Sequence, residues 1–162
     1  MRIEGHGIAV ELPEGWEGAI DRRPEPAPEA AGRAGTTSTR VETEHPITHL
    51  ANFPLPNGRG DFGSGAVETM TSTDVLVCLL EYGNEDAGTP LFAHEGVPTL
   101  TPAQFSPAAM QRTIEGMSGT QAFFTEGGRA FCLYAVVGSH RDRRALVPEV
   151  NDLLRTLRID PA

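Results

Sequence analysis

The stretch from Thr120 to Ile159 decides the fold, and it reads TQAFFTEGG, then RAFCLYAVVGSHRDRRA, then LVPEVNDLLRTLRI. The first two pieces have the β-branched and aromatic residues of strands, and they meet at Gly127-Gly128. Two glycines at such a junction supply the positive φ values that a tight hairpin turn requires. The pattern therefore predicts an antiparallel hairpin, whose second strand runs from Arg129 to Val137 and is covered on both faces.

A helix follows this hairpin, because the period of the apolar residues changes after Ser139. Leucine and valine side chains then recur with the spacing of one helix face: Leu146, Val147, Val150, Leu153, Leu154 and Leu157. This face has to be buried, and the neighbouring hairpin offers the surface to bury it. We expect the helix to pack on the sheet that contains the hairpin.

Other strands are expected earlier in the chain, at Gly7–Leu12, Glu17–Asp21, Ile47–Phe53, Asp74–Tyr82 and Met110–Glu115. The segment Asp74–Tyr82 (DVLVCLLEY) contains a continuous apolar run, which is typical of a central strand. The turn Pro13-Glu14-Gly15 favours pairing of Glu17–Asp21 back on Gly7–Leu12. With a short helical turn at Gly65–Met70, the pattern predicts an α+β fold, an antiparallel sheet of about six or seven strands with flanking helices.

The whole chain of 162 residues is expected to form a single domain, residues 1–162, with a core that needs no metal or disulfide. Residues 22–40 (RRPEPAPEAAGRAGTTSTR) are rich in Pro, Ala, Gly and Thr and contain no aromatic residue. This composition is typical of a mobile surface loop or an insertion. Cys78 and Cys132 lie in predicted strands, so we expect buried, reduced thiols; whether the two are adjacent stays open.

The net charge of −9 argues against nucleic acid or an anionic membrane as the main partner, because both attract clustered positive charge. All 13 basic residues are arginine, which excludes a Schiff-base lysine, a P-loop lysine and a Ser-Lys dyad. No apolar run approaches the roughly 20 residues that cross a bilayer, and the N-terminus lacks the apolar core of a signal peptide. We expect a cytoplasmic protein.

Catalytic and metal-binding patterns are weak in this sequence. The segment Gly116–Thr120 (GMSGT) departs from G-x-S-x-G, and a strand rather than a helix follows it. His45 and His49 would share one face of a strand but lie about 13 Å apart, which is too far for one metal ion. We therefore expect no catalytic residue, no metal site and no cofactor.

The turn from Pro54 to Gly65 (PLPNGRGDFGSG) is the best candidate binding site. It joins two strong strands and carries Arg59, Asp61 and Phe62 among small residues, and binding residues concentrate in loops held by a rigid scaffold. Tyr82, at the end of the next strand, completes the candidate binding set. A local alternative stays open, in which Asp61 caps the helical turn near Ser64 or pairs with Arg59.

Both ends of the chain resemble the PsbP-like α/β sandwich, through GGRAFCLYAVVGS followed by a helix ending LLRTLRI and through an opening strand closed by LPEGW. The middle resembles uncharacterised actinobacterial proteins, with NFPLP at Asn52–Pro56, GRGDFG at Gly58–Gly63 and LLEYG at Leu79–Gly83. The resemblance implies a small antiparallel sheet with helices on its two sides and a non-enzymatic binding or assembly role. It brings no ligand and no catalytic residue with it.

The sequence thus favours a non-enzymatic cytoplasmic adaptor or assembly module that docks to an unidentified protein partner. A second hypothesis is a small-molecule-binding protein or enzyme, with a pocket between sheet and helix near Trp16, Phe53, Phe62 and Tyr82. A third hypothesis is a homo-oligomer. Self-association leaves no recognisable pattern in one sequence, so this alternative stays open.

Overall fold

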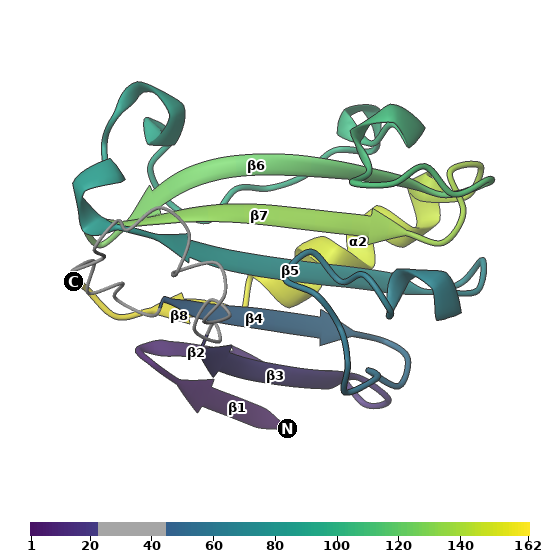
Figure 1. Ribbon diagram of the computed structural model, residues 1–162, viewed down its shortest axis with the longest axis horizontal. Helices are drawn as coiled ribbons and strands as arrows, with labels where there is room; N and C mark the ends of the chain where they lie inside the picture. The colour runs from purple at the N-terminus through teal and green to yellow at the C-terminus, as the bar shows by residue number, and fades with distance from the viewer. Residues whose placement is uncertain (23–44) are drawn as a thin grey trace, which may run out of the picture.

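The computed structural model describes residues 1–22 and 45–162, which form two antiparallel sheets and one α-helix (Figure 1). The strands are β1 (Arg2–Gly5), β2 (Ile8–Glu11), β3 (Glu17–Arg22), β4 (Pro46–Ala51), β5 (Val75–Tyr82), β6 (Ser118–Glu126), β7 (Arg129–Val137) and β8 (Arg158–Ile159). The helix, α2, spans Arg143–Leu154. One-turn 3-10 helices lie in the connections: η1 (Val67–Thr69), η2 (Asn84–Asp86), η3 (Pro90–Phe92), η4 (Pro102–Gln104) and η5 (Pro107–Ala109).

The fold class is α+β, as expected, but the described strands number eight and are divided between two sheets. The expectation of about six or seven strands is therefore close in number, but the expectation that they form one sheet is wrong. The predicted helical turn at Gly65–Met70 corresponds to η1. The predicted loop at residues 22–40 lies outside the described residues, except for Arg22, which ends β3.

The larger sheet has the strand order β3-β4-β5-β7-β6. Its central strand is β5, as the apolar run predicts, and every residue from Val75 to Glu81 is buried. The predicted hairpin is confirmed as β6 and β7, with Glu126 opposite Arg129. The turn residues Gly127 and Gly128 have φ values of 60° and 79°, a region in which residues with a side chain are strained.

The smaller sheet has the order β1-β2-β8 and overturns one predicted pairing. Strand β2 pairs with β1 through a two-residue turn at His6-Gly7, where φ is 52° and 76°, and with β8 along its other edge. Because both edges of β2 are occupied, the prediction that Glu17–Asp21 pairs back on Gly7–Leu12 is wrong. That segment is β3, and it pairs with β4 in the larger sheet.

Helix α2 packs on one face of the larger sheet, behind β5 and β7 in the view of Figure 1. Its predicted apolar face is confirmed for the five side chains that lie on the helix, all of which are buried: Leu146, Val147, Val150, Leu153 and Leu154. The predicted end of the helix is wrong, because α2 stops at Leu154 and the last residues of LLRTLRI form β8; Leu157, between the two, is also buried. They share a core with alternate residues of β5, namely Val75, Val77 and Leu79. The helical stripe and one face of the sheet therefore form a single hydrophobic layer.

Irregular segments with one-turn 3-10 helices, rather than α-helices, cover the other face of the larger sheet. The second core on this face joins sheet residues with side chains from the segment after β4 and the segment before β6: Leu76, Cys78, Leu80, Cys132 and Tyr134 with Phe53, Phe62, Val67, Met110, Ile114 and Met117. The expectation of flanking helices therefore holds for one face only. The predicted strand at Met110–Glu115 is wrong, because this segment lies across the sheet, where the backbone N–H of Gln111 donates to the Tyr134 hydroxyl at 2.9 Å.

One buried arginine links the two sheets: Arg129 forms an ion pair with Glu81 inside the larger sheet and reaches backbone carbonyls of the smaller one. Arg129 donates to Glu81 twice, from Nε at 2.9 Å and from Nη2 at 2.7 Å. It also donates to the backbone carbonyls of His6 at 2.9 Å, Gly7 at 3.4 Å and Asp160 at 3.1 Å. The guanidinium of β7 therefore holds the β1–β2 turn and the chain after β8 against the larger sheet.

Cys78 and Cys132 are both free and buried, as expected. They lie on the neighbouring strands β5 and β7, where Cys78 is opposite Tyr134 and Cys132 is opposite Leu80, so the two thiols share a face at diagonal positions. Burial raises the pKa of both thiols, that of Cys132 to about 11. Among residues 1–22 and 45–162, no helix has the length and apolar content to span a membrane.

Candidate functional site

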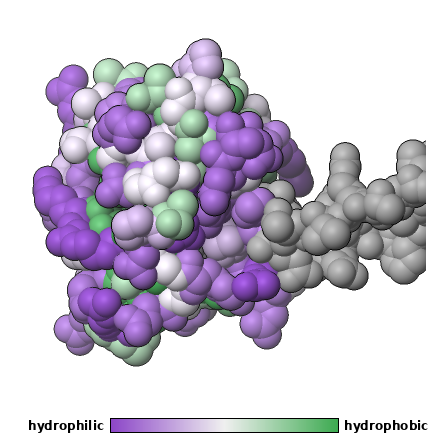
Figure 2. Space-filling model, turned by 90° about the vertical axis from the view of Figure 1, so that its left-hand side faces the viewer, coloured by the Kyte–Doolittle hydropathy of each residue, from purple (hydrophilic) through white to green (hydrophobic). Residues whose placement is uncertain are grey.

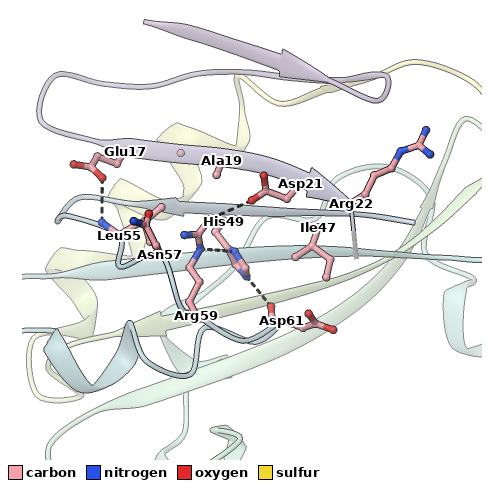
Figure 3. A pocket seen from close by; sticks show the side chains of 11 residues that line it. Glu17, Ala19, Asp21, Arg22, Ile47, His49, Leu55, Asn57, Arg59 and Asp61 are labelled. Atoms are coloured by element: carbon pink, nitrogen blue, oxygen red, sulfur yellow. Dashed lines mark hydrogen bonds and ion pairs between the residues drawn. The ribbon is translucent and has the colours of Figure 1, made fainter. Parts of the chain in front are cut away.

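A groove of about 480 Å³ lies on the face of the larger sheet opposite α2, between β3, β4 and the turn Pro54–Gly65 (Figure 3). We call it the β3–β4 groove. Its floor is formed by Glu17, Ala19 and Asp21 of β3 with Ile47 and His49 of β4, and its wall by Leu55, Asn57, Arg59 and Asp61 of the turn. The strand residues share one face because side chains alternate along a strand, and the register places Ala19 opposite His49 and Asp21 opposite Ile47.

Arg59 fastens the turn to the sheet. Its Nε donates to Nδ1 of His49 at 2.8 Å, its Nη1 to the carbonyl of Pro56 at 2.8 Å, and its Nη2 to Oδ2 of Asp21 at 3.3 Å. The Arg59 side chain is 10% exposed, whereas that of Asp21 is 65% exposed. Nε and Nη2 therefore hold the turn against β4 and β3, as the dashed lines of Figure 3 show, while Nη1 forms a hydrogen bond within the turn itself.

His49 connects β4 to the same turn at a second point. Its Nε2 lies 2.8 Å from the backbone carbonyl of Asp61, so Nε2 carries the proton and donates it, while Nδ1 accepts from Arg59. The ring is therefore neutral. Burial lowers the pKa of His49 below its ordinary value, and this effect outweighs the hydrogen bond to Asp61, which favours the protonated ring.

Two carboxylates stand at the rim of the groove. Oε1 of Glu17 accepts from the backbone N–H of Leu55 at 3.1 Å, and Oδ2 of Asp21 accepts from Arg59. Within the part of the chain that the structure describes, the second oxygen of each carboxylate accepts no hydrogen bond. Glu17, Asp21 and Asn57 are exposed, so the groove offers polar groups at its mouth.

The structure brings together two of the four residues proposed from the sequence. Arg59 and Asp61 line the groove. Phe62 turns into the core instead, with its ring 5.5 Å from that of Tyr134 in an edge-on contact. Tyr82, at the far end of β5, packs its ring 5.4 Å from that of Phe92. Phe62 and Tyr82 are thus half-buried packing residues on the same side of the sheet, outside the lining of the groove.

The local alternatives for Asp61 are not what the structure shows. The cap position of η1 is Ala66, with no side-chain hydrogen bond, and Arg59 pairs with Asp21 on β3 rather than with Asp61. It is the backbone carbonyl of Asp61 that matters for the groove, because it accepts from His49.

Sequence reasoning did not find Glu17, Asp21 and His49 as partners of the turn. The alternation of β3 places Glu17 and Asp21 on one face, and this signal was readable in the sequence. Which strand faces the turn was not readable, because it depends on the pairing of β3 with β4.

The second hypothesis placed an aromatic pocket between sheet and helix, and the four residues named for it do not share a cavity. Trp16 packs against the core on the α2 side. Phe53, Phe62 and Tyr82 belong to the core on the opposite side of the sheet. The aromatic residues are packing residues of two separate layers.

Acid-base and metal chemistry find little support in the groove. The lone pair of His49 that a general base would use already accepts from Arg59. Among the described residues, no group of three or more His, Cys, Asp or Glu side chains is placed to hold a metal ion.

Comparison of the chain with protein-family models, with curated protein sequences and with solved structures gives no match.

Proposed function

We propose that this chain is a cytoplasmic, non-enzymatic docking module that binds a protein partner in the β3–β4 groove. The observation that carries the proposal is the way the turn Pro54–Gly65 is fastened. Arg59 and the carbonyl of Asp61 hold the turn to His49 of β4, at 2.8 Å each. A recess whose wall is held in place before binding loses little conformational entropy when a partner docks.

A protein surface fits this groove better than a small molecule does. Small-molecule pockets are enclosed and lined mostly by apolar side chains. Here the mouth carries exposed Glu17, Asp21, Arg22 and Asn57, the pattern of an interface rim. The resemblance of the chain ends to the PsbP-like sandwich also favours docking, since such folds commonly act on partners in this way.

The rest of the described surface offers no broad apolar patch to a partner. Met1 and Leu91 are its exposed large apolar side chains. Hydrophilic residues predominate on the face that Figure 2 shows, and apolar residues are scattered among them. Together with the net charge of −9, this favours a partner with a polar, net basic surface.

The proposal is tested by photo-crosslinking in cells of the source organism. A benzophenone amino acid replaces Asn57 at the mouth of the groove, and in a matched control it replaces exposed Glu149 on α2, on the other side of the sheet. We expect a discrete protein adduct from position 57 that position 149 does not give. An adduct of twice the chain's mass would identify the partner as a second copy.

Identical adducts from both positions, or none from position 57, would contradict docking in the groove. In that case a thermal-shift screen of polar metabolites decides whether the groove binds a small ligand instead.

A further inference from the structure

One imidazole ring contacts the wall of the β3–β4 groove at two points. His49 is 5% exposed and lies between two residues of the same turn, Arg59 and Asp61. One ring nitrogen accepts from Arg59 and the other donates to Asp61, each at 2.8 Å. The ring therefore clamps the turn to β4 at two points, and both clamps require the neutral tautomer with its proton on Nε2.

A protonated ring cannot keep both contacts. Imidazolium carries N–H groups on both nitrogens, so Nδ1 would present a hydrogen to the Nε–H of Arg59. Two donors and two positive charges would then meet in a buried place, where charge repulsion is poorly screened. Either Arg59 or the ring has to move away, and Arg59 would take the turn with it.

The other charged groups around the ring do not remove this conflict. Asp61 on the turn and Asp21 on β3 favour the protonated ring, whereas burial and Arg59 oppose it, and burial is the largest of these effects. Cys78 on β5 lies opposite His49 in the register, and its thiol is buried and uncharged because burial raises its pKa. The net result is a ring that stays neutral at neutral pH.

We propose that His49 is a proton-operated latch: its protonation detaches Arg59, releases the turn Pro54–Gly65 from β4, and dismantles the β3–β4 groove while the sheet stays folded. The loss of partner binding in mild acid rests on the docking function proposed above; the release of the turn does not. The sheet persists because β4, β5 and β7 are held by their own ladders and by the core on the α2 side.

The test is hydrogen exchange across the turn, followed by mass spectrometry in mildly acidic and neutral buffer and corrected for the intrinsic pH dependence of exchange. The ordinary pKa of histidine is 6.5, and that of His49 is lower. As pH falls from the first value to the second, the fraction of molecules in which the turn is released should grow about tenfold per pH unit. Strands β5 and β7 should keep their protection throughout.

Two variants make the result specific to the ring. In His49→Gln, a neutral amide can accept from Arg59 and donate to Asp61 at every pH, so the turn should stay protected. His49→Leu removes both contacts, so the turn should exchange fast at every pH. Nitrogen-15 spectra of the wild-type ring should show the proton on Nε2 at neutral pH.

A turn whose exchange depends on pH equally in wild type and His49→Gln would overturn the latch, as would a ring protonated on Nδ1 at neutral pH. If the latch behaves as expected but the crosslinking experiment yields no partner, the docking function fails and the release of the turn stands.

Discussion

Replacing Arg129 with methionine should reveal how much the buried ion pair contributes to stability. The side chains of Arg129 and Glu81 are 9% and 6% exposed, and Glu81 accepts two hydrogen bonds from Arg129. No other residue that the structure describes donates to the carboxylate of Glu81. Arg129→Met therefore leaves a buried carboxylate with neither a cation nor a hydrogen-bond donor.

A lone carboxylate in such a place takes up a proton rather than staying charged. At about pH 7 the protonation of a carboxyl group with an ordinary pKa of about 4.3 costs about 3.7 kcal/mol, at about 1.36 kcal/mol per pKa unit. This value falls within the roughly 3–5 kcal/mol observed when one partner of a buried pair is removed. We expect Arg129→Met to lower the free energy of unfolding by about 3–4 kcal/mol.

The free energy of unfolding that Arg129→Met loses should become smaller as pH falls. In the variant, the folded state keeps a proton on Glu81 at pH values where the unfolded state has released it. Lower pH therefore favours the folded variant, and between about pH 7 and about pH 5 it should recover about 2.7 kcal/mol relative to wild type.

Urea unfolding at the two pH values measures this, with the double variant Glu81→Leu/Arg129→Met as the control. The double variant has no buried charge, so it should lose only about 1–2 kcal/mol and show no added pH dependence. A loss below about 1 kcal/mol in Arg129→Met, or one that does not change with pH, would refute the reasoning.

Three further outcomes are expected. Leu153→Ala truncates a fully buried side chain between α2 and the sheet and should lower the free energy of unfolding by about 2–5 kcal/mol in urea; an unchanged midpoint would mean the helix face is wrong. A Cβ at Gly138 would lie 1.9 Å from the backbone carbonyl oxygen of Thr71, whereas one at Gly58 would meet nothing within 4 Å. Gly138→Ala should therefore lower the melting temperature markedly and Gly58→Ala should leave it nearly unchanged, and equal shifts would contradict the packing. Because burial lowers the pKa of His49, its contribution to global stability should be complete above pH 6.5 and be lost as pH falls through the lowered pKa, and His49→Gln should remove this part of the pH profile in calorimetry.

Much of the fold was readable from short stretches of sequence. The Gly127-Gly128 hairpin, the central strand β5 and the apolar face of α2 are all confirmed. Each depends on a local pattern: a turn that needs positive φ, a run buried on both faces, or a period of a helix. Strand β1 was not predicted, because the turn that follows it lacks the usual sequence signal. That turn uses His6 with positive φ, where a two-residue hairpin usually has Asn, Asp or Gly.

The candidate site was readable only in part. The Pro54–Gly65 turn and its Arg59 and Asp61 stood out in the sequence because glycine, proline and charge gather there. Phe62 and Tyr82 stood out for their size, and the structure uses that size for packing against Tyr134 and Phe92.

The sequence alone determined the local elements, because turn chemistry and apolar periodicity act between residues near each other in the chain. Only the tertiary structure decided that β2 lies between β1 and β8 and that β3 pairs with β4, which places Asp21 diagonally across from His49. These contacts join residues far apart in sequence, and their free energy comes from burial and hydrogen bonding that no single segment contains. The groove, its Arg59 fastening and the neutral His49 ring exist only once those distant strands have paired.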